Sequence, residues 1–323
     1  MLCSICQNDM QRFGRNRNGS QRYRCDTCAR TFTDEQTRPA DRRRVEESRL
    51  TMCLRMLLEG MSIRSAERLT GIHRDTIIAA LVEAGDNCQR WLAVAVRGVP
   101  AADVQADEIW GFVHCKEKTR ERRNLPQEMG DAYCFTALER NTKLILAWHL
   151  GKRCPLDTAE FADKLYVATE GRFQLTTDGY TPYQTVIPTL FRSRVDFATL
   201  VKVYGEPEEE ARRRYSPPRI TEVIATVRTG EPDPALICTS HVERSNLTIR
   251  MMIRRMTRLT NAFSKKWDNH EAALALFFAY YNFCRPHMTL TESAGHKCTP
   301  AMASNLTDYV WSLQELLRNA DRV

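Results

Sequence analysis

The sequence predicts an α/β protein in which a mixed sheet with flanking helices is preceded by two small modules. Residues 103–204 alternate strand-like stretches with two helical patterns, an order that places helices on the faces of a mixed sheet. Before them, four cysteines fall in two CxxC pairs, and short helical patterns separated by a glycine follow. The 323 residues, 43% of them hydrophobic, can fill a large core beside these modules.

We expect residues 1–37 to form a zinc ribbon. Cys3 and Cys6 make one pair, and Cys25 and Cys28 make the second after eighteen intervening residues. With this spacing, two turns can bring four thiolates around one structural Zn²⁺. A disulfide pair or a redox site is the alternative. The other eight cysteines are scattered without a pairing pattern, which is typical of thiols in a reducing compartment and disfavours both.

Arginines dominate the stretch between the two cysteine pairs. Asn18-Gly19 predicts a hairpin turn there. Because the module has little apolar content, we expect it to need the metal in order to fold. Its surface would be basic and suited to phosphate, with Arg22 and Arg24 as candidate DNA-binding residues. The arginines of this stretch are Arg12, Arg15, Arg17, Arg22 and Arg24.

Residues 42–92 predict a helix-turn-helix module, reached through a basic linker at 38–44. After a first helical pattern, a short amphipathic helix is broken at Gly71, and another helix begins near His73. His73, Arg74 and Thr76 would stand at the start of this recognition helix as candidate DNA contacts. A helical hairpin with no DNA role is the alternative. The apolar positions of the three helices are Leu50, Leu54, Leu57 and Leu58, then Ile63, Ala66 and Leu69, then Ile77, Ile78 and Leu81.

A larger domain is expected over residues 100–300, with a C-terminal helical tail at 301–323. Its five strands are predicted at 103–115, 131–139, 143–150, 173–179 and 195–204. Helices are predicted at 157–169, 182–191 and 267–284. A basic loop, 116–123, joins the first two strands, and Asn141-Thr142 makes a short turn before the third. A polar, proline-rich insertion occupies about 205–240.

Three carboxylates of this domain occupy positions where sites tend to form. Asp107 lies within the first strand, where an unpaired buried charge is costly. Asp178 ends the fourth strand, at the sheet edge where ligands bind, and Glu243 begins a helix that would pack across both. Two Mg²⁺ or Mn²⁺ ions about 4 Å apart, held by such carboxylates, can activate a water or a 3′ hydroxyl at a phosphodiester. Alternatively, each acid is a cap, a salt-bridge partner or solvated. Glu108 should point to the opposite face from Asp107.

Residues 241–259 predict an amphipathic helix led by Glu243. At 100° per residue, Arg250, Arg254 and Asn261 fall within about 20° of the glutamate. An ordinary surface helix with favourable charge spacing is the alternative. The apolar residues of the opposite side are Ile249, Met252, Met256, Leu259 and Phe263.

The charge distribution indicates a polyanionic partner. The net charge is +7, residues 1–44 hold ten Arg or Lys against five Asp or Glu, and residues 243–266 hold seven against one. No apolar run approaches the ~20 residues of a membrane span, and no signal-peptide pattern opens the sequence. We therefore expect a cytoplasmic protein without a membrane partner.

The motifs "ADEIWGF", "TTDGY" and "HVERSNLTIRMMIRRMTRLTNAFSKK" resemble the three acidic motifs of bacterial DDE transposases, most closely those of the insertion sequence 1 family. The likeness covers nearly the whole chain in module order. It implies a ribonuclease H-like core in which Asp107, Asp178 and Glu243 are the catalytic residues and bind two Mg²⁺ or Mn²⁺. Arg250 matches a basic residue that such enzymes place seven positions after the glutamate to hold DNA, and Arg254 would receive the DNA backbone beside it.

The resemblance also implies a reaction and an assembly. The enzyme would bind the double-stranded DNA ends of its own element, hydrolyse the terminal phosphodiesters and join the freed 3′ hydroxyls to target DNA. Two ends imply at least a homodimer. One departure is the interval between Asp178 and Glu243, which the 205–240 insertion makes longer than in many relatives. "YYNFCRPH", 280–287, is similar to a tail motif of several transposase and integrase groups. A DNA-binding regulator with an inactive core, and a nuclease that cuts without joining, remain alternatives.

Overall fold

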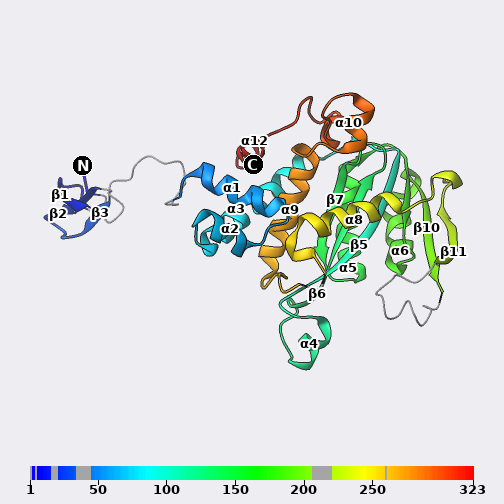
Figure 1. Cartoon of the computed structure of the whole chain (residues 1–323), viewed down its shortest axis with the longest axis horizontal. Helices are drawn as coiled ribbons and strands as arrows, with labels where there is room; N and C mark the ends of the chain where they lie inside the picture. Colours follow the sequence, from blue (N-terminus) through cyan, green and yellow to red (C-terminus); the bar gives the residue numbers. More distant parts are fainter. Residues whose placement is uncertain (1, 4–5, 16–20, 34–44, 206–219, 259) are drawn as a thin grey trace. The chain divides into compact units, whose positions relative to one another are not determined.

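The computed structural model describes the chain except for residues 1, 4–5, 16–20, 34–44, 206–219 and 259 (Figure 1). The chain divides into two compact units, Met1–Glu46 and Glu47–Val323. The expected hairpin turn at Asn18-Gly19, Arg17, most of the 38–44 linker and Leu259 lie outside the described residues. The first unit therefore contains the predicted zinc ribbon, and the second contains everything from the first predicted helix onward.

The first unit is a small antiparallel sheet of β1 (Met10–Arg15), β2 (Gln21–Cys25) and β3 (Thr31–Thr33). Its core consists of Cys3, Met10 and Cys25, against which the partly buried Tyr23 and Phe32 pack. Such a small core cannot supply much hydrophobic stabilisation. The expectation that the module depends on a bound metal is consistent with this packing.

The second unit begins with three helices, α1 (Glu47–Leu58), α2 (Ile63–Thr70) and α3 (Arg74–Ala95). Ser62 caps α2 by accepting the Ser65 backbone N–H, and Gly71 ends it with a left-handed φ of 69°. The helix boundaries agree with those predicted from the sequence. The predicted burial of Leu69 is wrong, because this side chain is 65% exposed and α2 buries only Ala66 of its apolar positions completely.

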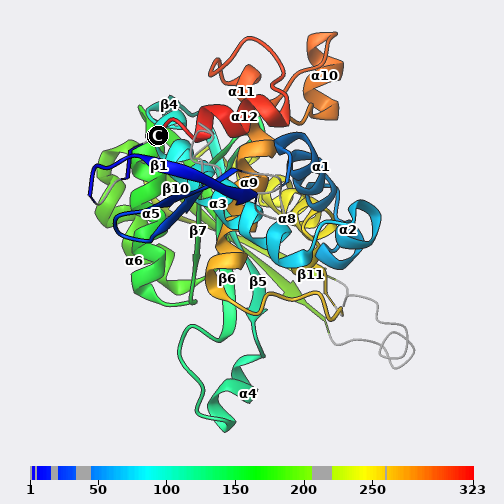
Figure 2. The ribbon, with the colours of Figure 1, turned by 90° about the vertical axis from the view of Figure 1, so that its left-hand side faces the viewer.

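The helix α3 connects this helical layer to the rest of the unit. It runs for 22 residues and packs along α9 (Trp267–Phe283), the most buried helix of the described chain. Gly85 is required at the crossing, because a Cβ there would overlap the backbone of Ala272. The predicted helix-turn-helix and the larger domain are therefore one packed body, in which α1 and α2 lie beside α8 and α9 (Figures 1 and 2).

The larger domain contains a six-stranded mixed sheet in the order β11-β10-β9-β5-β6-β7. The central strands β5, β9 and β10 are parallel to one another, whereas β6, β7 and β11 join by antiparallel pairing. This arrangement is compatible with a ribonuclease H-like core. The strands are β5 (Asp103–Val113), β6 (Gly130–Glu139), β7 (Ile145–Gly151), β9 (Phe173–Thr177), β10 (Val195–Tyr204) and β11 (Ile220–Thr229).

The prediction of five strands was wrong, because β11 lies inside the stretch expected to be an insertion without secondary structure. The prolines that gave this stretch its irregular composition lie outside 220–229, and the ten residues of β11 are rich in Val, Ile and Thr. They pair with β10 over nearly its whole length. Composition averaged over 205–240 therefore hid a strand of ordinary sequence.

Helices cover both faces of the sheet. On one face lie α5 (Pro155–Ala168) and α6 (Thr181–Phe191), and on the other lie α8 (Ser240–Met252) and α9. The expected basic loop at 116–123 contains a short helix, α4 (Glu117–Arg122), which projects beyond the ends of β5 and β6 (Figures 1 and 2). The remaining short elements are β4 (Val99–Pro100), β8 (Thr169–Glu170), η1 (Arg192–Arg194), η2 (Pro234–Leu236), η3 (Arg254–Met256), α10 (Met288–Ala294), α11 (Pro300–Ala303) and α12 (Leu313–Ala320).

The helix α8 ends earlier than predicted. Ile253 adopts an extended backbone conformation and is buried, and the single-turn helix η3 follows it. The burial of Ile253 and Met256 is achieved by this turn and not by continued helical periodicity. Arg254 and Asn261 therefore do not share a helical face with Glu243. None of the helices in the described ranges is both long and apolar enough to cross a membrane.

Candidate metal centre and basic cleft

The acidic residues meet where the strand β9 ends. Thr177, its last residue, pairs with Ala106, and β5 continues to Val113 with no further described strand on that side except an isolated bridge between Val113 and Ser264. Asp107 and Glu108 are the next two residues of β5, and Asp178 directly follows β9. One carboxylate oxygen from each of these three residues lies within 4.8 Å of the others. The fold thus brings the two predicted aspartates together.

Glu108 was expected to point to the opposite face of β5 from Asp107, and its contact with Tyr183 of α6 agrees with this. Because β9 stops at this level, the carboxylate can still reach round the strand end toward Asp178. Glu108 is only 3% exposed, and burial, followed by the charge of Asp178, raises its pKa to about 8.

Asp107 is held from the side of α8. The Asn246 side-chain amide donates to its Oδ2 at 2.6 Å, and the Glu108 backbone N–H donates to Oδ1 at 2.9 Å. Burial raises the pKa of Asp107 to about 6, and the nearby charges of Asp178 and Glu243 act in the same direction. A carboxylate with this environment favours a bound proton or a bound cation.

Glu243 lies at the margin of this cluster. The buried Gln105 of β5 accepts the backbone N–H groups of His241 and Val242 at 3.0 and 3.2 Å, which fixes the first turn of α8 over the strand. The Glu243 carboxylate accepts the Thr239 hydroxyl at 2.7 Å and forms an ion pair with Lys202 of β10. It is 45% exposed and is not part of the 4.8 Å cluster.

Arg153 neutralises part of the acidic charge. Its guanidinium lies 3.4 Å from the Glu108 carboxylate and 3.7 Å from that of Asp178, and it stacks 4.3 Å from the ring centroid of Tyr180. It is 40% exposed, so it can exchange its partners without leaving solvent. The cluster is therefore a set of crowded oxygen ligands with a removable cation beside them.

The donor set fits a hard divalent cation. Mg²⁺ and Mn²⁺ prefer carboxylate oxygens and complete their shells with water or phosphate. Asp107 and Asp178 could hold such an ion, with Glu108 or Glu243 as a further ligand. One buried oxygen of Glu108, Oε1, has no hydrogen-bond partner, which leaves a ligand position on this residue.

Arg250 is occupied by the protein itself. Its guanidinium donates to the carbonyl oxygens of Trp110 and Met256, both at 3.0 Å. Burial lowers its pKa to about 10. These bonds tie the segment after α8 to β5, a few residues beyond Asp107. Arg254, in η3, is exposed.

The four cysteines of the first unit form a second candidate metal site. The Sγ atoms of Cys3 and Cys28 are 3.6 Å apart, and those of Cys6 and Cys25 are 3.3 Å apart. Bonds of ~2.3 Å at tetrahedral angles require sulfur separations of about 3.8 Å, whereas a disulfide needs about 2 Å. The backbone N–H of Cys28 is the largest of the effects that lower the pKa of Cys25 to about 6, whereas the hydrogen bond with Cys25 helps to raise the pKa of Cys6 to about 12, so without an ion the thiolate is favoured at Cys25 and not at Cys6.

The predicted DNA-binding residues of the first unit are near an aromatic ring. The guanidinium carbons of Arg22 and Arg24 lie 5.6 and 5.2 Å from the ring centroid of Phe13, which is 44% exposed. This stacking leaves the guanidinium edges available to other partners. A role in DNA binding stays a prediction for both arginines.

The start of α3 presents polar groups to solvent. His73 caps the helix by accepting the Asp75 backbone N–H at 3.3 Å, and its side chain is 63% exposed. The side chain of Arg74 is 49% exposed, and Thr76 is half-buried. The structure thus presents the predicted contacts at one helix end, and their reading of DNA stays a prediction.

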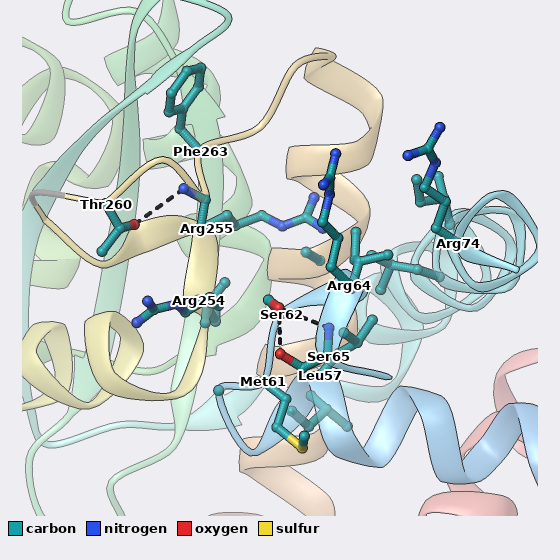
Figure 3. Close-up of a pocket in the computed structure, with 18 of the residues that line it drawn as sticks. Leu57, Met61, Ser62, Arg64, Ser65, Arg74, Arg254, Arg255, Thr260 and Phe263 are labelled. Carbon is teal, nitrogen blue, oxygen red and sulfur yellow. Dashed lines mark hydrogen bonds between the residues drawn. The ribbon is translucent and has the colours of Figure 1, made fainter. Parts of the chain in front are cut away.

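A basic cleft separates the helical layer from the segment that follows α8. It has a volume of about 780 Å³, and among the described residues that line it none is Asp or Glu. Figure 3 shows arginines on both sides of the same space, from α2 and α3 and from the segment after α8. Gly60 permits the close approach at its base, since a Cβ there would lie 2.7 Å from the carbonyl oxygen of Met251. The basic residues lining the cleft are Arg64, Arg74, Arg254, Arg255 and Lys265.

Several of these groups were not found from the sequence. Asn246 follows Glu243 by one turn of α8, so helical spacing could have indicated it. Gln105 precedes Asp107 by two residues of β5, so strand alternation could have placed it on the same face. Arg153 and Lys202 come from a loop and another strand, and no spacing relates them to the acids. Their placement depends on the sheet order alone.

No family model and no curated protein matches the chain, so the comparisons do not identify the insertion sequence 1 family. Among solved structures, the chain is similar to the piggyBac transposase in a cryo-electron-microscopy synaptic complex with hairpin DNA. The identity is 11%, the TM-score is 0.38, and the alignment covers 88% of this chain and 73% of that one. A likeness this distant carries no argument, and the function is inferred from the residues.

Proposed function

We propose that the protein is a DDE transposase of the insertion sequence 1 type, which cleaves DNA at the ends of its element and joins the 3′ ends to a target. The observation that supports this most is the acidic cluster at the end of β9, with Glu243 fixed over β5 by Gln105. Two Mg²⁺ or Mn²⁺ ions at such a cluster would supply an activated nucleophile and stabilise the leaving oxygen.

In this proposal the protein residues position the ligands. Asp107 and Asp178 bind metal from the sheet, and Asn246 orients Asp107 through its hydrogen bond. Glu243 completes the site once its carboxylate exchanges Lys202 for the ion, and Lys202 then faces the phosphodiester. Arg153 would likewise turn from the carboxylates toward the negatively charged backbone.

DNA binding is proposed to involve both units. The zinc ribbon, with Arg22 and Arg24, and the start of α3, with His73, Arg74 and Thr76, would bind the element ends. The basic cleft would bind the phosphate backbone beside α3, because the described residues of its walls include cations and no acid. A basic surface beside the predicted recognition helix, in a chain that also has a cluster of carboxylates able to hold a metal ion, fits a nuclease or transposase better than a regulator.

The experiment uses the DNA that flanks the gene. Inverted repeats bounding the reading frame would supply duplexes with the element ends, which are incubated with the full chain, Mg²⁺ or Mn²⁺ and a supercoiled plasmid. Nicking at the repeat end followed by plasmid-linked product supports the transposase. Nicking without joined product would leave a nuclease.

One observation favours a second candidate, a DNA-binding regulator with an inert core. Lys202 forms an ion pair with Glu243, as it would if this glutamate had only a structural role. A regulator would bind the end-bearing duplex tightly in a mobility-shift assay and give no nicked product with either ion. That result would reject the proposed enzyme.

A further inference from the structure

The strand β11 has a long and apolar open edge. Seven of its ten residues are β-branched, and the described residues contain no strand beyond it (Figure 1). It contains neither proline nor lysine, two residues that commonly protect edge strands. An edge of this kind offers a row of backbone donors and acceptors to another strand.

The side chains of β11 are exposed on both faces of the sheet. Val223 and Val227 are each 53% exposed on one face, and Ile224 is 41% exposed on the other. Ile220 is 45% exposed and pairs with Tyr204 beyond a register shift, so it shares the face of Val223. The register with β10 assigns these faces. Val223 pairs with Lys202, which contacts Glu243, so Val223, Ala225 and Val227 face α8. Glu222, Ile224 and Thr226 face the side of α6.

The charges of the strand are self-complementary. A two-fold axis perpendicular to a sheet must pass through a residue of an antiparallel pair, because directly opposite residues share a face. With the axis at Ala225, Glu222 lies opposite Arg228 of the second copy, and this pair occurs twice. Val223 lies opposite Val227 in the same register. Moving the axis by one residue, to Ile224 or Thr226, leaves both charges without a partner of opposite sign.

We propose that two copies of this chain dimerise by antiparallel pairing of their β11 strands about Ala225. Glu222 and Arg228 are both exposed and can form the cross-strand ion pairs: Glu222 faces away from α8 by its register, and Arg228, at a register shift of β11, contacts Thr199 on that same face. The Arg228 Nε donates to Thr199 of β10 at 3.1 Å, which directs its guanidinium along this face. The partner is a second copy because the strand matches its own reverse.

The dimer does not depend on the proposed function, but its consequence for DNA binding rests on that function. The two-fold axis places both α8 helices, and hence both acidic sites, on the same face of one continuous sheet. Five strand spacings of about 4.8 Å separate the two β9 strands, roughly 24 Å in all. Two DNA ends could then be held side by side on one surface.

The test exchanges charges in the full chain and measures self-association by analytical ultracentrifugation. Glu222→Arg puts arginine opposite arginine, and Arg228→Glu puts glutamate opposite glutamate, so each should weaken the dimer about tenfold or more. An equimolar mixture of the two variants restores both ion pairs and should associate as tightly as the wild type. The double variant E222R/R228E should also dimerise. Restoration on mixing excludes misfolding as the cause of the single-variant defect.

A cross-link tests the register. Ala225 faces itself at the axis, so Ala225→Cys should form a covalent dimer under mild oxidation. The matched control Glu222→Cys retains all twelve native cysteines, but its thiols would lie about 20 Å apart along the strands and should not cross-link. A wild type that is monomeric at every concentration, or single variants that associate unchanged, would overturn the proposal. A wild type that dimerises in ultracentrifugation but gives neither nicked nor joined DNA in the transposition assay would reject the proposed function alone.

Discussion

The two candidate metal sites of this protein are built in opposite ways. In the first unit, four thiols come from two CxxC turns close together in the sequence, and a small sheet holds them within bonding distance of one ion. In the second unit, the acids come from β5, from the residue after β9 and from α8, and only the sheet order brings them together. The first site can be identified from spacing, whereas the membership of the second depends on where a strand ends.

This difference explains the ambiguity about the third acid. Asp107 and Asp178 meet as expected, but the carboxylate closest to both is that of Glu108, and Glu243 lies at the margin in contact with Lys202. A motif can identify a residue as part of a site, but it does not predict the distance of that residue from the other site residues. Substitution of each of these two glutamates therefore tests which of them is the third metal ligand.

The largest expected effect is that of Glu243→Gln. The substitution keeps the size of the side chain and the helix but removes a proposed metal ligand, so cleavage and joining should both fall about 10³-fold or more. Binding of element ends should be retained, because the residues proposed to bind them lie elsewhere. Gel assays of nicked and joined product measure both steps.

Glu108→Gln is the matched control in the same cluster. We expect it to lower cleavage less than tenfold, since Glu243 and not Glu108 would complete the site. A reversed ranking of the two variants would identify Glu108 as the third ligand. It would also mean that the third acid of this chain is not the glutamate that the motif resemblance implies.

The next effect is the loss of zinc in Cys25→Ser. Purified protein should contain about one zinc per chain, and this variant should contain almost none, because a three-thiol site binds far more weakly and the small sheet depends on the metal. Metal analysis and the hydrogen exchange of residues 21–33 measure the change. Cys115→Ser, outside the cluster, should keep its zinc. A zinc-free wild type with a protected β2 would show that the cysteines are structural thiols.

The sequence predicted the elements of the fold better than their connections to the site. The strands β5, β6, β7, β9 and β10 were found within a few residues, since each has a strong local pattern. The strand β11 was missed because the composition of its neighbours was averaged with its own. The end of α8 was missed because the burial of Ile253 depends on the core that surrounds it and not on the helical period.

The candidate site was predictable only where its residues belong to motifs. Asp107, Asp178 and the four cysteines are brought together as expected. Arg153 and Lys202 carry no local signal, because any of many arginines and lysines could have filled these positions. Their roles follow from distances that only the folded chain provides.

A smaller effect is the pH dependence of stability at the acidic site. The pKa values of Asp107 and Glu108 are raised to about 6 and about 8, so the folded state holds more protons than the unfolded chain between about pH 4 and 8. Stability from this cluster is therefore present at low pH and is lost as the pH rises through that window. Mg²⁺ requires the ionised form, so the rise in Tm that it causes should be greater near pH 8 than near pH 6. Thermal scans of the wild type and of Glu108→Gln, in which the dependence should shrink, provide the measurement. A Mg²⁺ shift that is the same at both pH values would contradict the assignment.

The smallest effect distinguishes the two arginines that follow Glu243. Arg254 is exposed beside the basic cleft, so Arg254→Ala should remove one phosphate contact and reduce the slope of log K against log salt by about one unit on every sequence. Arg250 donates to two carbonyl oxygens, and each charged hydrogen bond contributes about 1.5–3 kcal/mol, so Arg250→Ala should lower Tm by several degrees and leave the slope unchanged. Salt-dependent DNA binding and thermal scans of both variants measure the contrast. If Arg250→Ala instead lowers the slope by a full unit at unchanged Tm, its guanidinium leaves Trp110 for the DNA, and Arg250 holds phosphate as the motif resemblance implies.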